Sequence, residues 1–172
     1  MKFKKPKFWD YRKPGFISYI LIPISISLQI FKLIIEFIIK KRKYIQIKAI
    51  CVGNIYLGGT GKTSLSLKIN EILKKKVKSC FIKKYYPNQI DEQKLLANYG
   101  KLFKSKDRSS SIKQAIDEGF ELAIFDDGLQ DPFIEYDYSI VCFNIENWIG
   151  NGLTIPSGPL RENIKNLKKY KN

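Results

Sequence analysis

The segment that most constrains this chain is a glycine-rich loop between an apolar run and an amphipathic stretch. The apolar run covers residues 49–52, and apolar positions after the loop recur at helical spacing. The loop reads Leu57-Gly58-Gly59-Thr60-Gly61-Lys62-Thr63. Glycines let backbone N–H groups converge on phosphate oxygens, the helix N-terminus adds partial positive charge, and lysine and threonine supply a cation and a hydroxyl for Mg²⁺. The order strand, loop, helix predicts a site for a nucleoside triphosphate.

One position departs from the strict phosphate-loop pattern. Tyr56 stands where that pattern has its first glycine, and the pair Gly58-Gly59 takes over the flexibility. A glycine-rich turn without a ligand is the alternative, but it leaves the Lys-Thr pair without a purpose. We predict that ATP is bound by Tyr56, Leu57, Gly58, Gly59, Thr60, Gly61, Lys62 and Thr63, with Lys62 also assisting transfer and Thr63 binding Mg²⁺.

Basic residues are concentrated near the N-terminus. The 172 residues include 31 Lys and Arg against 16 Asp and Glu, a net charge of +15, and residues 1–43 hold eleven of the basic and two of the acidic residues. Within this block, the mostly apolar stretch 16–39 is flanked on both sides by basic residues, Lys2 and Lys4 among them. It is long enough to cross a bilayer, which takes about 20 apolar residues.

The polar residues of this stretch argue for a helix that lies on a membrane. They share one helical face: Ser18, Ser25, Gln29, Lys32 and Glu36. A charged residue at mid-bilayer costs about 2.5–3.5 kcal/mol on insertion scales. We therefore predict that residues 1–44 form an amphipathic, membrane-associating helix in the interface, with a spanning helix and an ordinary core helix as the alternatives.

Other features of the composition narrow the chemistry. The basic residues lie beside an apolar helix and not among interleaved aromatics and glycines, so no nucleic-acid partner is expected. The chain has no histidine, so a proton acceptor must be a carboxylate, or a lysine or tyrosine. Cys51, Cys80 and Cys142 are widely spaced without metal-ligand spacing, which indicates core thiols.

The remaining sequence, residues 45–172, alternates as a parallel α/β sheet would. We expect strands at 79–82, 101–103, 122–125 and 138–143, and helices at 91–98 and 108–118. The run 122–125 ends in Asp126, and an aspartate there holds Mg²⁺ in phosphate-loop proteins; an Asp-Gly turn is the alternative. The expected fold class is α/β, a P-loop NTPase-like parallel sheet flanked by helices, with the N-terminal helix attached.

Together these motifs resemble the tetraacyldisaccharide 4′-kinases of lipid A biosynthesis. The resemblance spans almost the whole chain and corresponds to the N-terminal half of such enzymes. It is carried by Val52-Gly53-Asn54, Gly58-Gly59-Thr60-Gly61-Lys62-Thr63, Asp91-Glu92, Asp126-Asp127-Gly128-Leu129-Gln130, Gly150-Asn151-Gly152 and Pro156-Ser157-Gly158-Pro159-Leu160-Arg161-Glu162. Asp131 stands where the family usually has histidine, and Lys83-Lys84-Tyr85-Tyr86 replaces an Arg-Gly-Tyr motif.

The resemblance implies an activity and a place in the cell. Such kinases transfer the γ-phosphate of ATP, with Mg²⁺, to the 4′-hydroxyl of a tetraacyldisaccharide 1-phosphate at the cytoplasmic face of the inner membrane of Gram-negative bacteria. It implies that Asp91 is the base and that Asp126 and Asp127 serve metal binding and catalysis. Arg161 lies in a Gly- and Pro-rich loop and could pair with a substrate phosphate.

Alternatives of other classes stay open. Because the family's second half closes the cleft, a missing C-terminal half is an expected partner, or the chain is a non-catalytic nucleotide-binding remnant. A membrane-tethered P-loop ATPase of the partitioning or targeting type is the other alternative, since such proteins have similar double-glycine loops.

Overall fold

Two units make up the chain. The structure, a computed structural model, describes residues 5–44 and 46–170, so Lys2 and Lys4 of the predicted basic flank lie outside the described residues. Within that part, the helix unit comprises 5–40, 55–60 and 143–169, and the sheet unit comprises 41–44, 46–54, 61–142 and 170.

The sheet unit is built on a five-stranded parallel sheet. Its strands are β1 (Lys48–Gly53), β2 (Ser79–Lys84), β3 (Leu102–Ser105), β4 (Leu122–Asp126) and β5 (Tyr138–Val141), in the order β3-β2-β4-β1-β5. At the centre, Cys51 pairs with Phe125 on one side and Ser139 on the other. β1 is an interior strand of this sheet, and parallel sheets bind ligands at the carboxyl ends of their strands.

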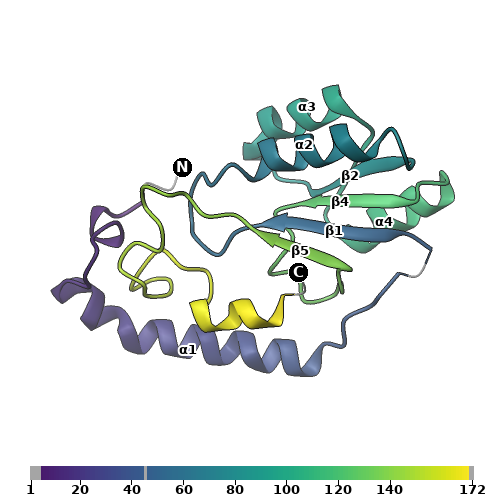
Figure 1. The fold of residues 1–172 in the computed structure, drawn as a ribbon. Coiled ribbons are helices and arrows are strands. Elements are labelled where there is room, and N and C mark those ends of the chain that lie inside the picture. Colours follow the sequence, from purple (N-terminus) through teal and green to yellow (C-terminus); the bar gives the residue numbers. More distant parts are fainter. Residues whose placement is uncertain (1–4, 45, 171–172) are drawn as a thin grey trace. The chain divides into compact units, whose positions relative to one another are not determined.

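Helices cover both faces of this sheet (Figure 1). On one face α2 (Lys62–Leu73) and α3 (Ile90–Tyr99) pack over strand residues such as Val52 and Ile124. On the other face α4 (Arg108–Asp117) packs over their strand neighbours Cys51 and Phe125. The alternation follows from the two-residue period of a strand, and burial on both faces explains the apolar run of β4, whose five residues are all buried.

The predicted elements of this unit are confirmed, with small shifts at their ends. The helix expected at 108–118 begins after Asp107, whose carboxylate accepts bonds from the backbone N–H groups of Ser109 and Ser110. The last strand ends at Val141, earlier than expected. A 3-10 turn, η2 (Pro87–Gln89), precedes α3 and was not predicted.

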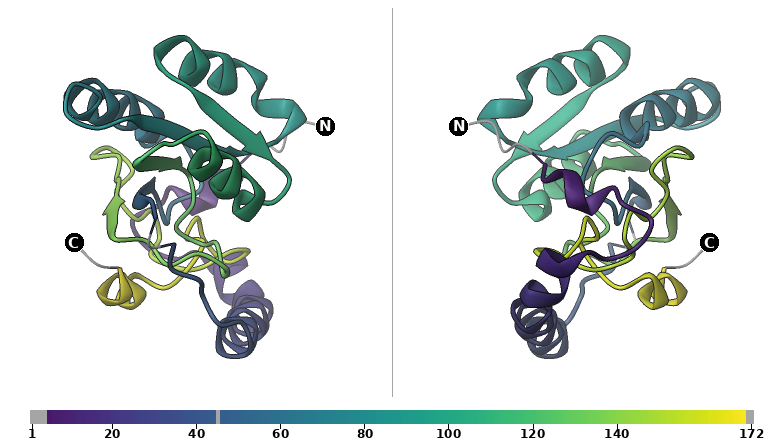
Figure 2. Two further views of the ribbon diagram at one scale, coloured as in Figure 1. Left: turned by 90° about the vertical axis from the view of Figure 1, so that its right-hand side faces the viewer. Right: turned by 90° about the vertical axis from the view of Figure 1, so that its left-hand side faces the viewer.

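In the helix unit, α1 (Phe16–Ile38) lies beside loops and two short 3-10 helices. These are η1 (Lys7–Trp9) and η3 (Ile164–Lys169). Figure 2 views α1 nearly along its axis, and the loops of the unit gather on one side of it. Among the described residues, α1 is the one helix long and apolar enough to cross a membrane, judged by length and composition.

The predicted polar stripe of α1 exists, and it faces the protein. Ser18 and Ser25 are buried, with exposed fractions of 0 and 4%. Ser25 donates to the Thr154 carbonyl oxygen at 2.9 Å and accepts from the Ser157 backbone N–H at 3.0 Å. The opposite face leaves large apolar side chains in the open, with Phe37 92% exposed. The described residues therefore cover the polar stripe and leave the apolar face uncovered.

Two glycine-containing motifs form the surface on which this stripe rests. The Asn151 amide donates to Ser18 Oγ at 3.0 Å and to the Ser157 carbonyl oxygen at 2.9 Å. Gly150 has a φ of +58°, and a Cβ there would lie 2.2 Å from the Trp9 carbonyl oxygen. Only glycine fits this turn, which packs against the backbone of the N-terminal segment at Trp9.

Candidate active site

The predicted ATP-binding residues divide between the two units. Tyr56 to Thr60 belong to the helix unit, and Gly61 to Thr63 belong to the sheet unit. Gly61 is the N-cap of α2 with a left-handed φ of +75°, a conformation that glycine adopts without strain. Lys62 and Thr63 open the helix, so the backbone N–H groups of its first turn lack intrahelical partners and carry the positive end of the helix dipole. This geometry suits phosphate.

In the helix unit, the Pro-Leu-Arg segment supports the start of the loop. The Leu57 backbone N–H donates to the Pro159 carbonyl oxygen at 2.8 Å, and the Arg161 N–H donates to the Ile55 carbonyl oxygen at 2.6 Å. Arg161, the predicted substrate residue, is therefore held by its backbone beside the chain that enters the loop. Its role toward a substrate phosphate stays a prediction.

Tyr56, the residue in place of a glycine, has its own partners. Its ring is buried, and its hydroxyl donates to Asp10 and accepts from Lys5 Nζ at 2.8 Å. Lys5 also pairs with Asp10 at 2.6 Å. Burial by itself would raise the pKa of the Asp10 carboxyl, but the hydrogen bonds from Lys5 and Tyr56 outweigh it and hold this pKa below its ordinary value. Tyr56 thus anchors the loop to the N-terminal segment.

The two predicted metal ligands meet in the sheet unit. Thr63 Oγ1 donates to Asp126 Oδ2 at 3.1 Å. Asp126 is fully buried at the end of β4, and its second oxygen, Oδ1, has no hydrogen-bond partner among the described residues. A buried carboxylate oxygen without a partner is costly, and Mg²⁺ or its bound water would satisfy it. A hydroxyl and a carboxylate are oxygen ligands that Mg²⁺ accepts, so these residues fit the ion.

Lys83 is the member of this cluster that the sequence did not indicate. Its ammonium lies 2.5 Å from Asp126 Oδ2 and 2.7 Å from Glu92 Oε2. A lysine on an apolar strand gives no sign of a partner that is 43 positions away in sequence. Its two ion pairs depend on the order of the strands and on the position of α3.

Asp127 follows β4 in a left-handed conformation, with φ of +63°. Its backbone N–H donates to the Val52 carbonyl oxygen at 2.8 Å, and its own carbonyl oxygen accepts from Arg108 at 2.6 Å. Arg108 also bonds Asp131 at 2.9 Å, so the residue in the family's histidine position forms an ion pair. Positive φ is uncommon outside glycine and recurs at functional sites. The catalytic role of Asp127 stays a prediction.

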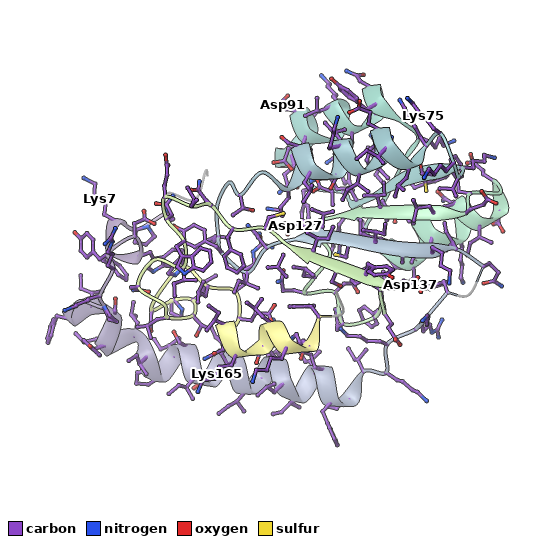
Figure 3. The ribbon with its side chains drawn as sticks, in the orientation of Figure 1. Lys7, Lys75, Asp91, Asp127, Asp137 and Lys165 are labelled. Atoms are coloured by element: carbon purple, nitrogen blue, oxygen red, sulfur yellow. The ribbon has the colours of Figure 1, made fainter. Side chains whose placement is uncertain are left out.

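Asp91 lies in the first turn of α3, exposed to solvent (Figure 3). Asp91 is not the N-cap of this helix, because that position is held by Gln89. Its neighbour Glu92 points to Lys83 and so connects this turn to Asp126. Among the predicted site residues of the sheet unit, the structure joins Thr63 and Asp126 directly, whereas Asp91 is only the sequence neighbour of Glu92.

The chain was compared with known proteins. A family model described as tetraacyldisaccharide-1-P 4'-kinase matches residues 17–171. A tetraacyldisaccharide 4'-kinase of Pelagibacter ubique is 63% identical over 175 residues, covering 100% of this chain and 54% of the relative. That of Rickettsia typhi is 32% identical, covering 97% and 56%. The chain thus spans about half the length of these curated relatives.

A solved structure has a similar fold. LpxK from Aquifex aeolicus, in complex with ATP, superposes with a TM-score of 0.77 at 23% identity, covering 90% of this chain and 57% of that one. At this identity the likeness establishes the fold alone. It confirms the predicted P-loop NTPase-like parallel sheet.

Proposed function

Because the chain belongs to the tetraacyldisaccharide-1-P 4'-kinase family, we propose that it takes part in transferring the γ-phosphate of ATP to the 4′-hydroxyl of a tetraacyldisaccharide 1-phosphate. Its own share is the nucleotide and metal site and a membrane-facing helix. The observation that carries this proposal is the Thr63–Asp126 contact at the N-terminus of α2, with Asp126 Oδ1 buried and unsatisfied. The ATP complex of the Aquifex aeolicus protein supports ATP as the donor.

Each residue of the site has a definite task in this reaction. The backbone N–H groups at the start of α2 hold phosphate oxygens, and Lys62 neutralises charge on the β- and γ-phosphates. Thr63 and Asp126 would hold Mg²⁺, which when bound offsets the phosphate charge. The described residues include no cluster of three or more His, Cys, Asp or Glu side chains that could hold a metal ion. Asp127 completes the acidic end of β4.

We propose that Asp91 is the general base, which accepts the proton of the acceptor hydroxyl. As the sugar oxygen bonds to the γ-phosphorus and the bond to ADP breaks, the hydroxyl proton passes to the Asp91 carboxylate. The chain has no histidine to serve instead. Exposure of Asp91 suits this role, since an acceptor hydroxyl must reach it from outside the sheet unit.

The membrane supplies the acceptor lipid, and α1 is the element that meets it. We propose that residues 1–44 serve membrane association and residues 45–172 phosphoryl transfer. The apolar face of α1 is exposed, while Lys32 and Glu36 are engaged with Glu162 and Lys169 of the same unit. A spanning helix would carry these ion pairs into hydrocarbon, whereas an interfacial helix leaves them in the protein. The net charge of +15 favours binding to anionic lipid. We propose that Arg161 pairs with the phosphate of the lipid substrate.

The position of the reaction follows from its substrates. ATP is available on the cytoplasmic side, so we place the chain at the cytoplasmic face of the inner membrane of a Gram-negative bacterium. The relatives are longer than this chain, and we propose a C-terminal half corresponding to their remaining length as a further partner.

Transfer from labelled ATP to the lipid acceptor tests the function. We expect a lipid labelled at the 4′ position from the parent chain, and a decrease of about 10²-fold or more for Asp91→Asn with ATP affinity retained, since that is within the range for loss of a general base. Asp117→Asn, an exposed aspartate on α4, is the matched control. Release of free phosphate without labelled lipid would contradict the proposal, and transfer by Asp91→Asn within a few-fold of the parent would remove Asp91 from the mechanism.

A further inference from the structure

Lys83 is a charged residue in the interior of the sheet unit. It lies on β2 next to the fully buried Phe81 and Ile82, and is itself 2% exposed. Strand β2 has neighbours on both sides, β3 and β4, so this is not a sheet edge. Burying an ammonium group costs several kcal/mol unless it is paired with good geometry. Packing alone therefore does not explain a lysine at this position, and its ammonium needs partners that offset the cost of burial.

Two carboxylates are those partners. Lys83 Nζ lies 2.5 Å from Asp126 Oδ2 and 2.7 Å from Glu92 Oε2. Burial by itself would lower the pKa of Lys83, but Asp126 and Glu92 outweigh it and raise this pKa above its ordinary value. The group is a cation in the folded protein, and it joins the end of β4 to the first turn of α3.

The contact makes the two oxygens of Asp126 unequal. Oδ2 accepts hydrogen bonds from both Lys83 and Thr63, whereas Oδ1 is buried with no hydrogen-bond partner among the described residues. Two donors on one oxygen fix the rotation of the carboxylate. Oδ1 is thereby held in one orientation, in which it is available to a ligand. Partners of this kind orient a metal-binding carboxylate, and their loss lowers metal affinity by about 10–100-fold.

The second arm acts on α3. Glu92 adjoins Asp91 in sequence, and its side chain, about half exposed, bonds the buried Lys83 ammonium. Because Glu92 lies in the first turn of α3, the bond fastens the end of the helix that carries Asp91.

We propose that Lys83 is a positioning residue that directs Asp126 Oδ1 toward Mg²⁺ and fastens the Asp91 end of α3 to the metal site. The proposal rests on the proposed function for its metal part. The fastening of α3 is a property of the protein without nucleotide, so it is tested separately.

Three variants separate the two arms. Lys83→Met removes the charge at similar length, and Glu92→Gln weakens the α3 arm while the contact with Asp126 stays. Lys84→Met is the matched control, because the neighbouring Lys84 is only partly buried and lies over the Tyr86 ring, with Nζ 5.9 Å from its centre. Two quantities are measured on the full chain: the Mg²⁺ affinity of the ATP complex, by titration with and without Mg²⁺, and amide hydrogen exchange of residues 90–99 without nucleotide.

We expect Lys83→Met to weaken Mg²⁺ binding by about 10–100-fold, with ATP affinity in the absence of Mg²⁺ unchanged, and to speed exchange in α3. Glu92→Gln should speed exchange in α3 and leave Mg²⁺ affinity within about threefold, because the Asp126 arm is intact. Lys84→Met should change neither. A merely structural Lys83 would lower overall stability without this difference between the two arms.

A folded Lys83→Met variant with the parent's Mg²⁺ affinity, or with the parent's exchange in α3, overturns the proposal. If Lys83→Met does not fold, Glu92→Gln decides, and exchange equal to the parent overturns the fastening of α3. If the parent itself binds no ATP, the proposed function fails instead, and the exchange comparison still decides the role of Lys83 in holding α3.

Discussion

Arg108 and Asp131 form a buried ion pair across the loop that follows β4, with Nη1 and Oδ2 2.9 Å apart. The same guanidinium donates to the Asp127 carbonyl oxygen at 2.6 Å. The pair therefore holds the turn in which Asp127 takes its left-handed conformation. The turn is thus supported by the Asp131 carboxylate through Arg108.

Loss of the Asp131 charge should destabilise the sheet unit. We expect Asp131→Asn to lower the free energy of unfolding by about 1.5–3 kcal/mol, since a charge-assisted hydrogen bond to a buried arginine is weakened. Asp117→Asn, at the exposed end of α4, should change it by less than about 0.5 kcal/mol. Denaturant titration measures both variants. Equal stability of Asp131→Asn and the parent would contradict the role given to this pair.

The polar stripe of α1 should matter for stability because it is buried. Ser25→Ala leaves the buried Ser157 backbone N–H without its acceptor and removes one of the two donors to the Thr154 carbonyl oxygen, the other being the Gly158 N–H, so we expect a loss of about 1–3 kcal/mol. Ser27→Ala is the control, since that side chain is exposed and bonds only within its own helix, to Pro23. If thermal or denaturant unfolding shows both variants to be equally stable, the stripe does not face the protein as described.

The sequence predicted most of the sheet unit for a physical reason. A strand buried on both faces, such as β4, appears in the sequence as an apolar run, and a glycine loop with Lys62 and Thr63 has few other uses, so the order and type of the elements could be predicted directly. The polar stripe of α1 was also evident from its period. What it faced was not, because a period of 3.6 residues identifies a face and leaves its neighbour unknown.

Contacts between distant residues were the part that sequence could not supply. Lys83 lies in an apolar run and pairs with Asp126 and Glu92, and Arg108 pairs with Asp131 across the β4 loop. Such pairs depend on strand order and register, which local patterns do not fix. The packing of Gly150 against the Trp9 backbone likewise joins residues that are far apart in sequence.

Membrane binding should depend on the exposed face of α1. We expect Phe37→Ser to lower the fraction of the chain that sediments with anionic phospholipid vesicles, because this ring is 92% exposed in the protein and would be buried in lipid. Tyr138→Ser, an exposed apolar residue of the sheet unit, is the control. High salt should release the parent only in part, since apolar burial is not screened. Complete release by salt, or equal sedimentation of Phe37→Ser and the parent, would exclude this face as the anchor.

The ATP site at the N-terminus of α2 is the central claim, and calorimetric titration of the full chain with ATP in the presence of Mg²⁺ tests it most directly. Lys62→Ala removes the cation expected to bond the β- and γ-phosphates, and Lys68→Ala removes an exposed lysine of the same helix that pairs only with Glu71. We predict saturable binding by the parent, affinity at least about tenfold weaker for Lys62→Ala, as expected for one charge-assisted hydrogen bond, and no change beyond about twofold for Lys68→Ala. Absence of binding by the parent, or equal affinity of Lys62→Ala and the parent, would contradict the claim.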